Sequence, residues 1–232
     1  MSGVRSTTVD LAESLRGVPI PFAGKVSRLP IRALLCNGAT PSRSVYPELH
    51  EVMYIEELCD LSSSATVTMT DTSEIAASDS VEGDGIPTGT TVVSVDDSTT
   101  ITLSHAATIT QNNVPLHFYA WGNGDGSTTF DLPDLRGAFL RGAGTGTIDT
   151  RDKVGPAVGA YQEDEMQGHR HELYHATGTA GATNILVRRT DGSSGALADW
   201  VRELVTDTVN GTPRTGTETR PYAAGVLWCI KT

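Results

Sequence analysis

Two histidines in the C-terminal third of the chain are the residues best suited to chemistry. They stand in the stretch Gly168-His169-Arg170-His171-Glu172. On an extended segment, residues two apart point to the same side, so one chain would present both imidazoles on one face. Two imidazoles alone make a weak metal site, and a pair of exposed histidines in a polar loop is the simpler interpretation.

A second stretch combines two acidic residues with one basic residue, Asp131-Leu132-Pro133-Asp134-Leu135-Arg136-Gly137. We expect Arg136 or Arg141 to pair with Asp131 or Asp134, which would fix the loop without any catalytic role. The preceding Gly122–Gly126 stretch is similar to the start of a calcium loop. It lacks the distal glutamate and the alternating oxygen ligands, so a tight turn is predicted.

Further carboxylates could in principle form a glycosidase pair, and they are Asp149, Asp152, Glu163, Asp164 and Glu165. Such a pair needs two carboxylates roughly 5–10 Å apart across a sugar cleft. A run of three acidic residues is typical of a solvated face. The sequence shows no nucleophile elbow, phosphate loop or Cys/His arrangement, so we expect no enzyme.

The composition favours short strands, turns and loops. Of 232 residues, 38% are hydrophobic and 6% aromatic, and there are 24 Gly and 11 Pro. The net charge of −11 disfavours nucleic acid and an anionic membrane surface as partners. No apolar run approaches the roughly 20 residues needed to span a bilayer, and no signal peptide is evident, so we expect synthesis in the cytoplasm without membrane insertion. The three cysteines Cys36, Cys59 and Cys229 are widely spaced, and we expect reduced, buried thiols.

The elements that must position these residues are mostly strands, and the predicted fold class is mainly β with one short helix. Ser44 is the predicted N-cap of that helix, which has a proline in its first turn. Tyr46, Leu49, Val52 and Met53 follow helical spacing and would face a core. Period-two alternation and turn signals predict strands over 19–26, 31–36, 65–70, 90–95, 99–103 and 221–232.

The chain divides by composition into six segments. We expect an N-terminal docking arm at 1–17, a first domain part at 18–59, an inserted small antiparallel β module at 60–118, a second domain part at 119–150, a loop-rich region at 151–219 and a closing strand at 220–232.

Ordered motifs occur in three parts of the chain. The first part holds Phe22-Ala23-Gly24, Leu34-Leu35-Cys36-Asn37-Gly38, Ser42-Arg43 and Tyr46-Pro47-Glu48-Leu49. The second runs from Gly124 to Gly137 with Phe139-Leu140-Arg141-Gly142, and the third is Glu218-Thr219-Arg220-Pro221 with the apolar tail. Together they resemble the phage tail collar domain family. The resemblance covers roughly 18–59, 119–145 and 216–232, and it departs from the family pattern where roughly 60 residues follow the helix.

The resemblance implies an intertwined homotrimer in the virion of a tailed bacteriophage, as a tail fibre or receptor-binding tip. Expected partners are a host-surface glycan, such as lipopolysaccharide, and other phage tail proteins. Only about 17 residues precede the domain, which implies a short fibre, a tip or a tail-end component. The alternatives are a baseplate, tail-tip or adaptor component without a receptor site, and a surface polysaccharide depolymerase.

The resemblance also implies a role for the paired histidines. Three copies of His169 and His171 on a threefold axis would supply six nitrogens to Fe²⁺ or Zn²⁺, and six imidazoles suit Fe²⁺ better. The segment 172–215 would then face the receptor. Its aromatic residues Tyr174 and Trp200 are suited to stacking on sugar rings, although Trp200 also fits a packing position on a short helix.

Overall fold

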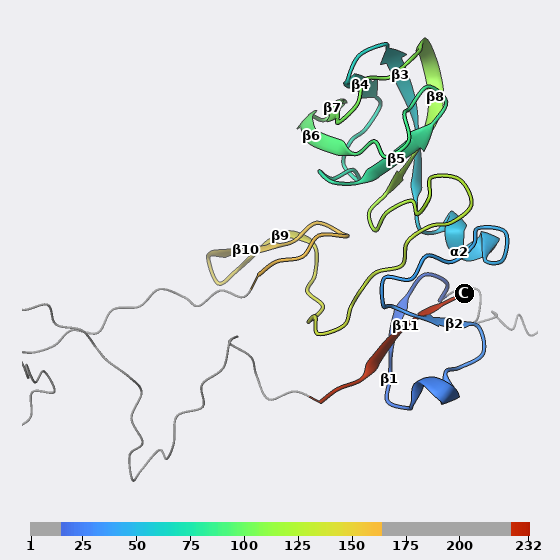
Figure 1. The fold of residues 1–232 in the computed structure, drawn as a ribbon. Coiled ribbons are helices and arrows are strands. Elements are labelled where there is room, and N and C mark those ends of the chain that lie inside the picture. The colour runs from blue at the N-terminus through green and yellow to red at the C-terminus, as the bar shows by residue number, and fades with distance from the viewer. Residues whose placement is uncertain (1–14, 164–223) are drawn as a thin grey trace, which may run out of the picture. The chain divides into compact units, whose positions relative to one another are not determined.

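The computed structural model of the protein describes residues 15–163 and 224–232 (Figure 1). The described part is mainly β with one short α-helix, which confirms that part of the expected fold class. The elements in chain order are β1 (Pro19–Phe22), the 3₁₀ helix η1 (Val26–Arg28), β2 (Ala33–Leu35), α2 (Pro47–Glu51), β3 (Ile55–Ser62), β4 (Thr66–Met69), β5 (Ser80–Gly83), β6 (Val92–Asp97), β7 (Thr100–Leu103), β8 (Thr110–Tyr119), β9 (Gly144–Ile148), β10 (Arg151–Gly155) and β11 (Leu227–Lys231).

A three-stranded antiparallel sheet joins the two ends of the chain. Its strand order is β1-β11-β2, and Cys229 at its centre faces Ile20 on one side and Leu35 on the other. β1 begins and continues with prolines, which suits an edge strand because proline donates no ladder hydrogen bond. The C-terminal strand is therefore central, and the rest of this sheet depends on it.

A hydrophobic cluster beside this sheet, here called the composite core, collects residues from distant parts of the chain. Its buried members are Cys36, Leu49, Tyr119, Phe130, Leu132, Leu135 and Ile230. Leu34, Tyr46, Met53, Tyr54, Trp121 and Trp228 pack against it while partly exposed. The predicted closing strand thus does contribute a buried residue.

The helix contributes less than its pattern suggested. α2 begins at Pro47 with Tyr46 as N-cap, and no side chain caps it, so the expectation for Ser44 is wrong. Leu49 is buried, whereas Val52 is 51% exposed, contrary to expectation. The reason is that Val52 is already the C-cap of a helix of five residues, so the helical spacing does not continue to its position.

The stretch between α2 and Ala120 forms a six-stranded antiparallel sheet with the order β5-β8-β3-β4-β7-β6 (Figure 1). The sheet curls until its outer strands meet. Ser78 N–H donates to Val92 O at 2.8 Å, Val92 N–H to Asp79 O at 2.9 Å, and Val81 N–H to Thr90 O at 2.9 Å. We call this closed sheet with its contents the closed module. Closure satisfies backbone groups that an edge strand would leave unpaired.

Alternating side chains fill the closed module. Val67 and Met69 on β4 point inward, as do Ile101 and Leu103 on β7, while the threonines between them point outward. These two strands lie within the predicted segments 65–70 and 99–103. The buried members of this core are Cys59, Leu61, Val67, Met69, Ile75, Val81, Val92, Ile101, Leu103, Ala107, Val114, Leu116 and Phe118.

β9 and β10 form a separate two-stranded hairpin. Asp149 and Thr150 at its tip have φ angles of 51° and 63°, which fit the two-residue turn that matches the twist of a hairpin. Val154 on β10 is 57% exposed. The hairpin thus carries an apolar side chain that the described residues do not cover.

Candidate functional site

The expected metal ligands and receptor residues are not among the residues that the structure describes. His169, His171, Tyr174 and Trp200 all lie in the segment 164–223, outside the described ranges. Within residues 15–163 and 224–232, no group of three or more His, Cys, Asp or Glu side chains is placed to hold a metal ion. The Fe²⁺ or Zn²⁺ site therefore stays a prediction.

The acidic and basic stretch forms one ion pair. The Arg136 guanidinium donates to Asp134 Oδ1 at 2.8 Å and Oδ2 at 2.5 Å. This hydrogen bonding lowers the pKa of Asp134. Arg141 instead donates to Gln162 Oε1 at 2.8 Å, and Asp131 forms no ion pair with a described residue. The Arg136 side chain is 71% exposed, so this pair orders a loop surface and contributes little to stability.

The glycine-rich stretch before it is a tight turn, as expected. Asp125 Oδ1 accepts the backbone N–H groups of Ser127, Thr128 and Thr129 at 2.7–3.0 Å. The Thr128 hydroxyl donates to Asp125 Oδ2, and these hydrogen bonds hold the pKa of Asp125 well below its usual range. Gly124, with φ +64°, adopts the left-handed conformation that the turn requires. The carboxylate is thus engaged within the turn, which leaves it poorly suited to bind a calcium ion.

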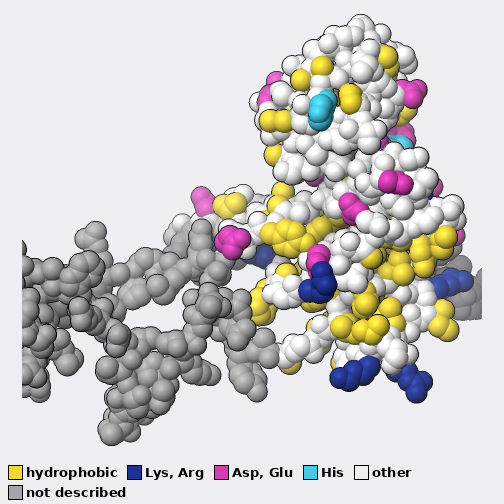
Figure 2. All heavy atoms as spheres, in the orientation of Figure 1, with side chains coloured by type: hydrophobic (Ala, Val, Ile, Leu, Met, Phe, Trp, Pro, Cys, Tyr) yellow, Lys and Arg dark blue, Asp and Glu magenta, His cyan; other side chains and the backbone are white. Residues whose placement is uncertain are grey.

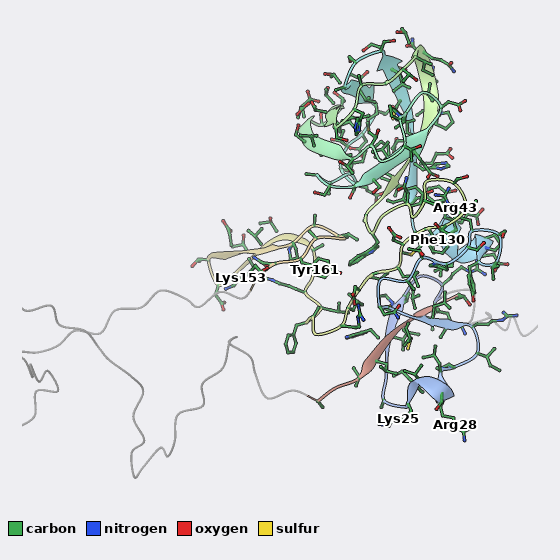
Figure 3. The ribbon with its side chains drawn as sticks, in the orientation of Figure 1. Lys25, Arg28, Arg43, Phe130, Lys153 and Tyr161 are labelled. Atoms are coloured by element: carbon green, nitrogen blue, oxygen red, sulfur yellow. The ribbon has the colours of Figure 1, made fainter. Side chains whose placement is uncertain are left out.

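The main polar feature of the described part is a half-buried cluster centred on Arg43 (Figure 3). Arg43 Nη1 and Nη2 donate to Glu82 Oε1 and Oε2 at 2.7 and 2.8 Å, and the two side chains are only 16% and 17% exposed. Arg43 Nε donates to Thr129 O at 2.8 Å, and Nη2 also donates to Asn123 O at 3.0 Å. One guanidinium therefore joins β5 to the chain before α2 and to the turn after β8.

Three neighbours complete this Arg43 cluster around the Glu82 carboxylate. Tyr119 OH donates to Glu82 Oε1 at 2.7 Å, and Asn123 Nδ2 donates to Oε2 at 3.3 Å. His50 Nε2 lies 3.0 Å from the Tyr119 hydroxyl. Because the Tyr119 proton is directed to Glu82, the neutral His50 ring is suited to donate to the Tyr119 oxygen.

The acid–base behaviour of the cluster follows from these contacts. Burial acts to raise the pKa of Glu82, but the hydrogen bonds from Arg43, Tyr119 and Asn123 outweigh it and the pKa is lowered. Burial and the adjacent Glu82 carboxylate raise the pKa of Tyr119. Burial, and then the Arg43 charge, lower the pKa of His50. At neutral pH the cluster thus holds one ion pair beside a neutral imidazole.

A second histidine borders the cluster. His117 Nε2 lies 3.1 Å from Glu56 Oε2, and its Nδ1 lies 3.6 Å from Glu82 Oε1. The Tyr54 ring contacts both imidazoles, with centroid distances of 5.0 Å to His50 and 4.3 Å to His117. The two histidines are far apart in the sequence, and only β-sheet pairing and the helix bring them to one aromatic ring.

The arrangement can hold these chain segments together, and it offers little for catalysis. Both Glu82 oxygens are occupied by donors, and Arg43 is engaged with Glu82, Thr129 and Asn123. The sequence gives no local signal for this cluster, because Arg43 and Glu82 are 39 residues apart. Only the period-two pattern of β5, which places Val81 inside and Glu82 outside, could have indicated that Glu82 lies on the outer face.

The cysteines are free and buried, as expected. Burial raises the pKa of the Cys36 thiol to about 11, with a smaller effect from Cys229, and the pKa of Cys59 to about 12. Thiols with such pKa values are protonated at neutral pH and are poor nucleophiles. They act as core residues.

Among the helices of the described ranges, none is long and apolar enough to cross a membrane. Comparison with known proteins adds no assignment: no family model, curated protein or solved structure matches the chain.

Proposed function

We propose that the chain is the subunit of a homotrimeric phage tail fibre or receptor-binding tip that attaches the virion to a host-surface glycan. The observation that carries the proposal is the origin of the composite core. Its members come from 34–54, 119–135 and 228–230, which are the stretches that resemble the tail collar domain. The residues between them enclose a core of their own. This separation is expected if a β module is inserted into a collar domain without interrupting its core.

Exposed apolar side chains support assembly with further copies. Ile31 is 89% exposed, Phe139 67% and Val45 64%. Figure 2 shows hydrophobic side chains gathered over the region of the three-stranded sheet, with fewer on the closed module. Surfaces of this kind are typical of interfaces, and a trimer would cover them while multiplying weak glycan contacts through avidity.

Basic side chains near η1 fit a phosphate-bearing glycan such as lipopolysaccharide. Lys25, Arg28 and Arg32 are exposed on the connection between β1 and β2, on a chain with a net charge of −11 (Figures 2 and 3). Their concentration on one connection favours approach to anionic groups there, although the chain as a whole is acidic. Attachment of this kind requires no catalytic group.

Binding of the purified full chain to envelope glycan from a panel of candidate hosts tests the proposal. We expect retention on immobilised glycan that disappears when 172–215 is replaced by a Gly/Ser linker of equal length. Sedimentation should give three times the 24.5-kDa chain mass. Firm incorporation into tails without glycan binding would indicate an adaptor, and release of reducing sugar would indicate a depolymerase. Either result would contradict the attachment proposal.

The predicted metal supplies a separate test. Three copies of His169 and His171 would hold Fe²⁺ or Zn²⁺ on the trimer axis and fix the register of the chains. Replacing both residues by alanine should abolish bound metal in elemental analysis and lower the melting temperature of the trimer. Unchanged metal content would show that these residues are not the ligands.

A further inference from the structure

A hollow of about 290 Å³ lies beside the closed module. One side is formed by 77–79, the loop that leads into β5, together with Ala120 after β8. The other side is formed by 158–161, which follow β10. Its volume is at the lower end of the range for small-molecule sites, about 300 Å³ upwards, and suits one small ring.

Asp79 is the charged group of the hollow, and one of its oxygens is unused. The residue is only 5% exposed. Its Oδ2 accepts the Ala76 N–H at 2.8 Å, and no described residue donates a hydrogen bond to Oδ1. Burial raises the pKa of this carboxyl group. This oxygen is not one of the fully buried polar atoms that lack a partner among the described residues, so it stays accessible to a donor such as a ligand hydroxyl.

The opposite wall is held in place by specific contacts. Gly159 has φ +84°, and a Cβ at this position would lie 1.9 Å from Ala120 O, so only glycine permits the approach. Tyr161 OH donates to Asp134 O at 2.8 Å. The Tyr161 and Trp121 rings pack in an edge-type arrangement, with a centroid distance of 6.3 Å and an interplanar angle of 75°. The Tyr161 side chain, labelled in Figure 3, is nevertheless 62% exposed.

We propose that this hollow binds a single neutral pyranose unit, with one sugar hydroxyl donating to Asp79 Oδ1 and the C–H face of the ring lying against Tyr161 and Val158. The lining combines the Asp79 carboxylate and the Ser78 hydroxyl with an aromatic ring and small apolar side chains. Such a lining can accept hydrogen bonds from sugar hydroxyls and pack against the C–H face of a sugar ring. A carboxylate disfavours anionic ligands. A single aromatic ring does not form the cage that a quaternary ammonium group prefers.

This inference rests on the proposed glycan attachment for its biological meaning, and it adds a contact to those predicted at Tyr174 and Trp200. The two proposals have separate tests. Attachment is tested with whole envelope glycan and replacement of the segment 172–215, whereas the hollow is tested with single sugars and a variant of Asp79.

Saturation-transfer NMR on the full chain tests the hollow, with methyl glucoside, methyl galactoside and methyl mannoside as probes and choline as a quaternary ammonium probe. We expect transfer to the C–H protons of at least one pyranoside and none to choline. Asp79→Asn keeps the side-chain shape and the bond to Ala76 but removes the free acceptor, and should weaken binding about tenfold or more. Asp84→Asn, an exposed carboxylate of the same module, is the matched control and should bind as the unaltered chain does.

Two further variants keep the test decisive if Asp79→Asn lowers stability. Tyr161→Ala alters an exposed side chain and should abolish transfer, and Gly159→Ala should do so by forcing the wall away from Ala120. Absence of transfer from all three pyranosides, unchanged transfer in Asp79→Asn, or choline binding that depends on Asp79 would overturn the proposal. Glycan attachment without pyranoside binding would refute only the hollow, and pyranoside binding without attachment would refute only the proposed function.

Discussion

The closed module and the part around the composite core bury their hydrophobic side chains in different ways. The closed module uses one continuous stretch, from Ile55 to Tyr119, although only the β3–β4 and β6–β7 pairs of its strand order join strands that are consecutive in the chain. The composite core instead gathers residues from three stretches, the last of which is the C-terminal strand. The first arrangement is self-contained, whereas the second forms only when distant segments meet.

The two parts also differ in how many large hydrophobic side chains they expose. The closed module has few large exposed hydrophobic side chains, namely Leu58, Val93 and Val95. The other part exposes many, including Val18, Ile20, Val26, Ile31, Val45, Phe139 and Leu140. A part that leaves this much apolar surface uncovered would gain stability from partners that cover it, as the proposed trimer would.

Removal of residues 224–232 should have the largest effect on this comparison. β11 is the central strand of its sheet, so β1 and β2 would each lose their strand partner in that sheet. The composite core would also lose Ile230. We expect loss of dispersed NMR amide signals from 18–54 while signals from the closed module persist. Simultaneous loss of both sets would show that the closed module is not self-contained.

Arg43→Ala should have the next largest effect. It leaves the Glu82 carboxylate half-buried without its cation, and loss of one partner of a buried ion pair costs about 3 kcal/mol. Urea unfolding checks this value. The double variant Arg43→Met with Glu82→Met is the control and should be destabilised less than Arg43→Ala, because no uncompensated charge remains; equal or greater destabilisation would contradict the cluster's assigned role.

The pH dependence of stability sharpens the comparison, because the Arg43 cluster brings together partly buried titratable groups from both parts, His50 from one and Glu82 from the other. The folded pKa of His50 lies below the unfolded value of 6.5, so the unfolded state binds more protons and stability falls as the pH drops through 6.5. The folded pKa of Glu82 lies below 4.5, so stability falls again below pH 4.5. Thermal unfolding from pH 8 to 4 should show both decreases.

His50→Gln is the control for this pH profile. It should remove the decrease near pH 6.5 and leave the one below pH 4.5. A profile in which stability is constant between pH 7 and 5 in the unaltered chain would show that His50 is not held neutral by the fold.

Arg136→Ala should have the smallest effect. Its ion pair with Asp134 is exposed, and solvent screening leaves such pairs with little net stabilisation. We expect no measurable change in the unfolding midpoint at 0.15 M salt. A change comparable to that of Arg43→Ala would show that the 131–137 loop contributes more to the composite core than its exposure indicates.

Prediction succeeded where the local pattern was regular. Alternation in 65–70 and 99–103 identified β4 and β7, and the apolar tail identified β11. β3 was missed because its acidic residues, such as Glu56 and Asp60, lower its strand propensity. β8 was missed partly because of Pro115. The residue is tolerated because β5 pairs only with 116–119, so β8 has one free side at that point among the described residues.

The sequence alone determined the β-rich character, the approximate position of the short helix, the tight turn at Asp125 and the burial of the cysteines, because these depend on composition and on neighbours a few residues apart. Only the tertiary structure decided that β5 and β6 meet, that Glu82 receives Arg43, and that Asp79 opens into a hollow beside Gly159. Each of these depends on the register and curl of a sheet, which are set by packing between segments that are remote in sequence.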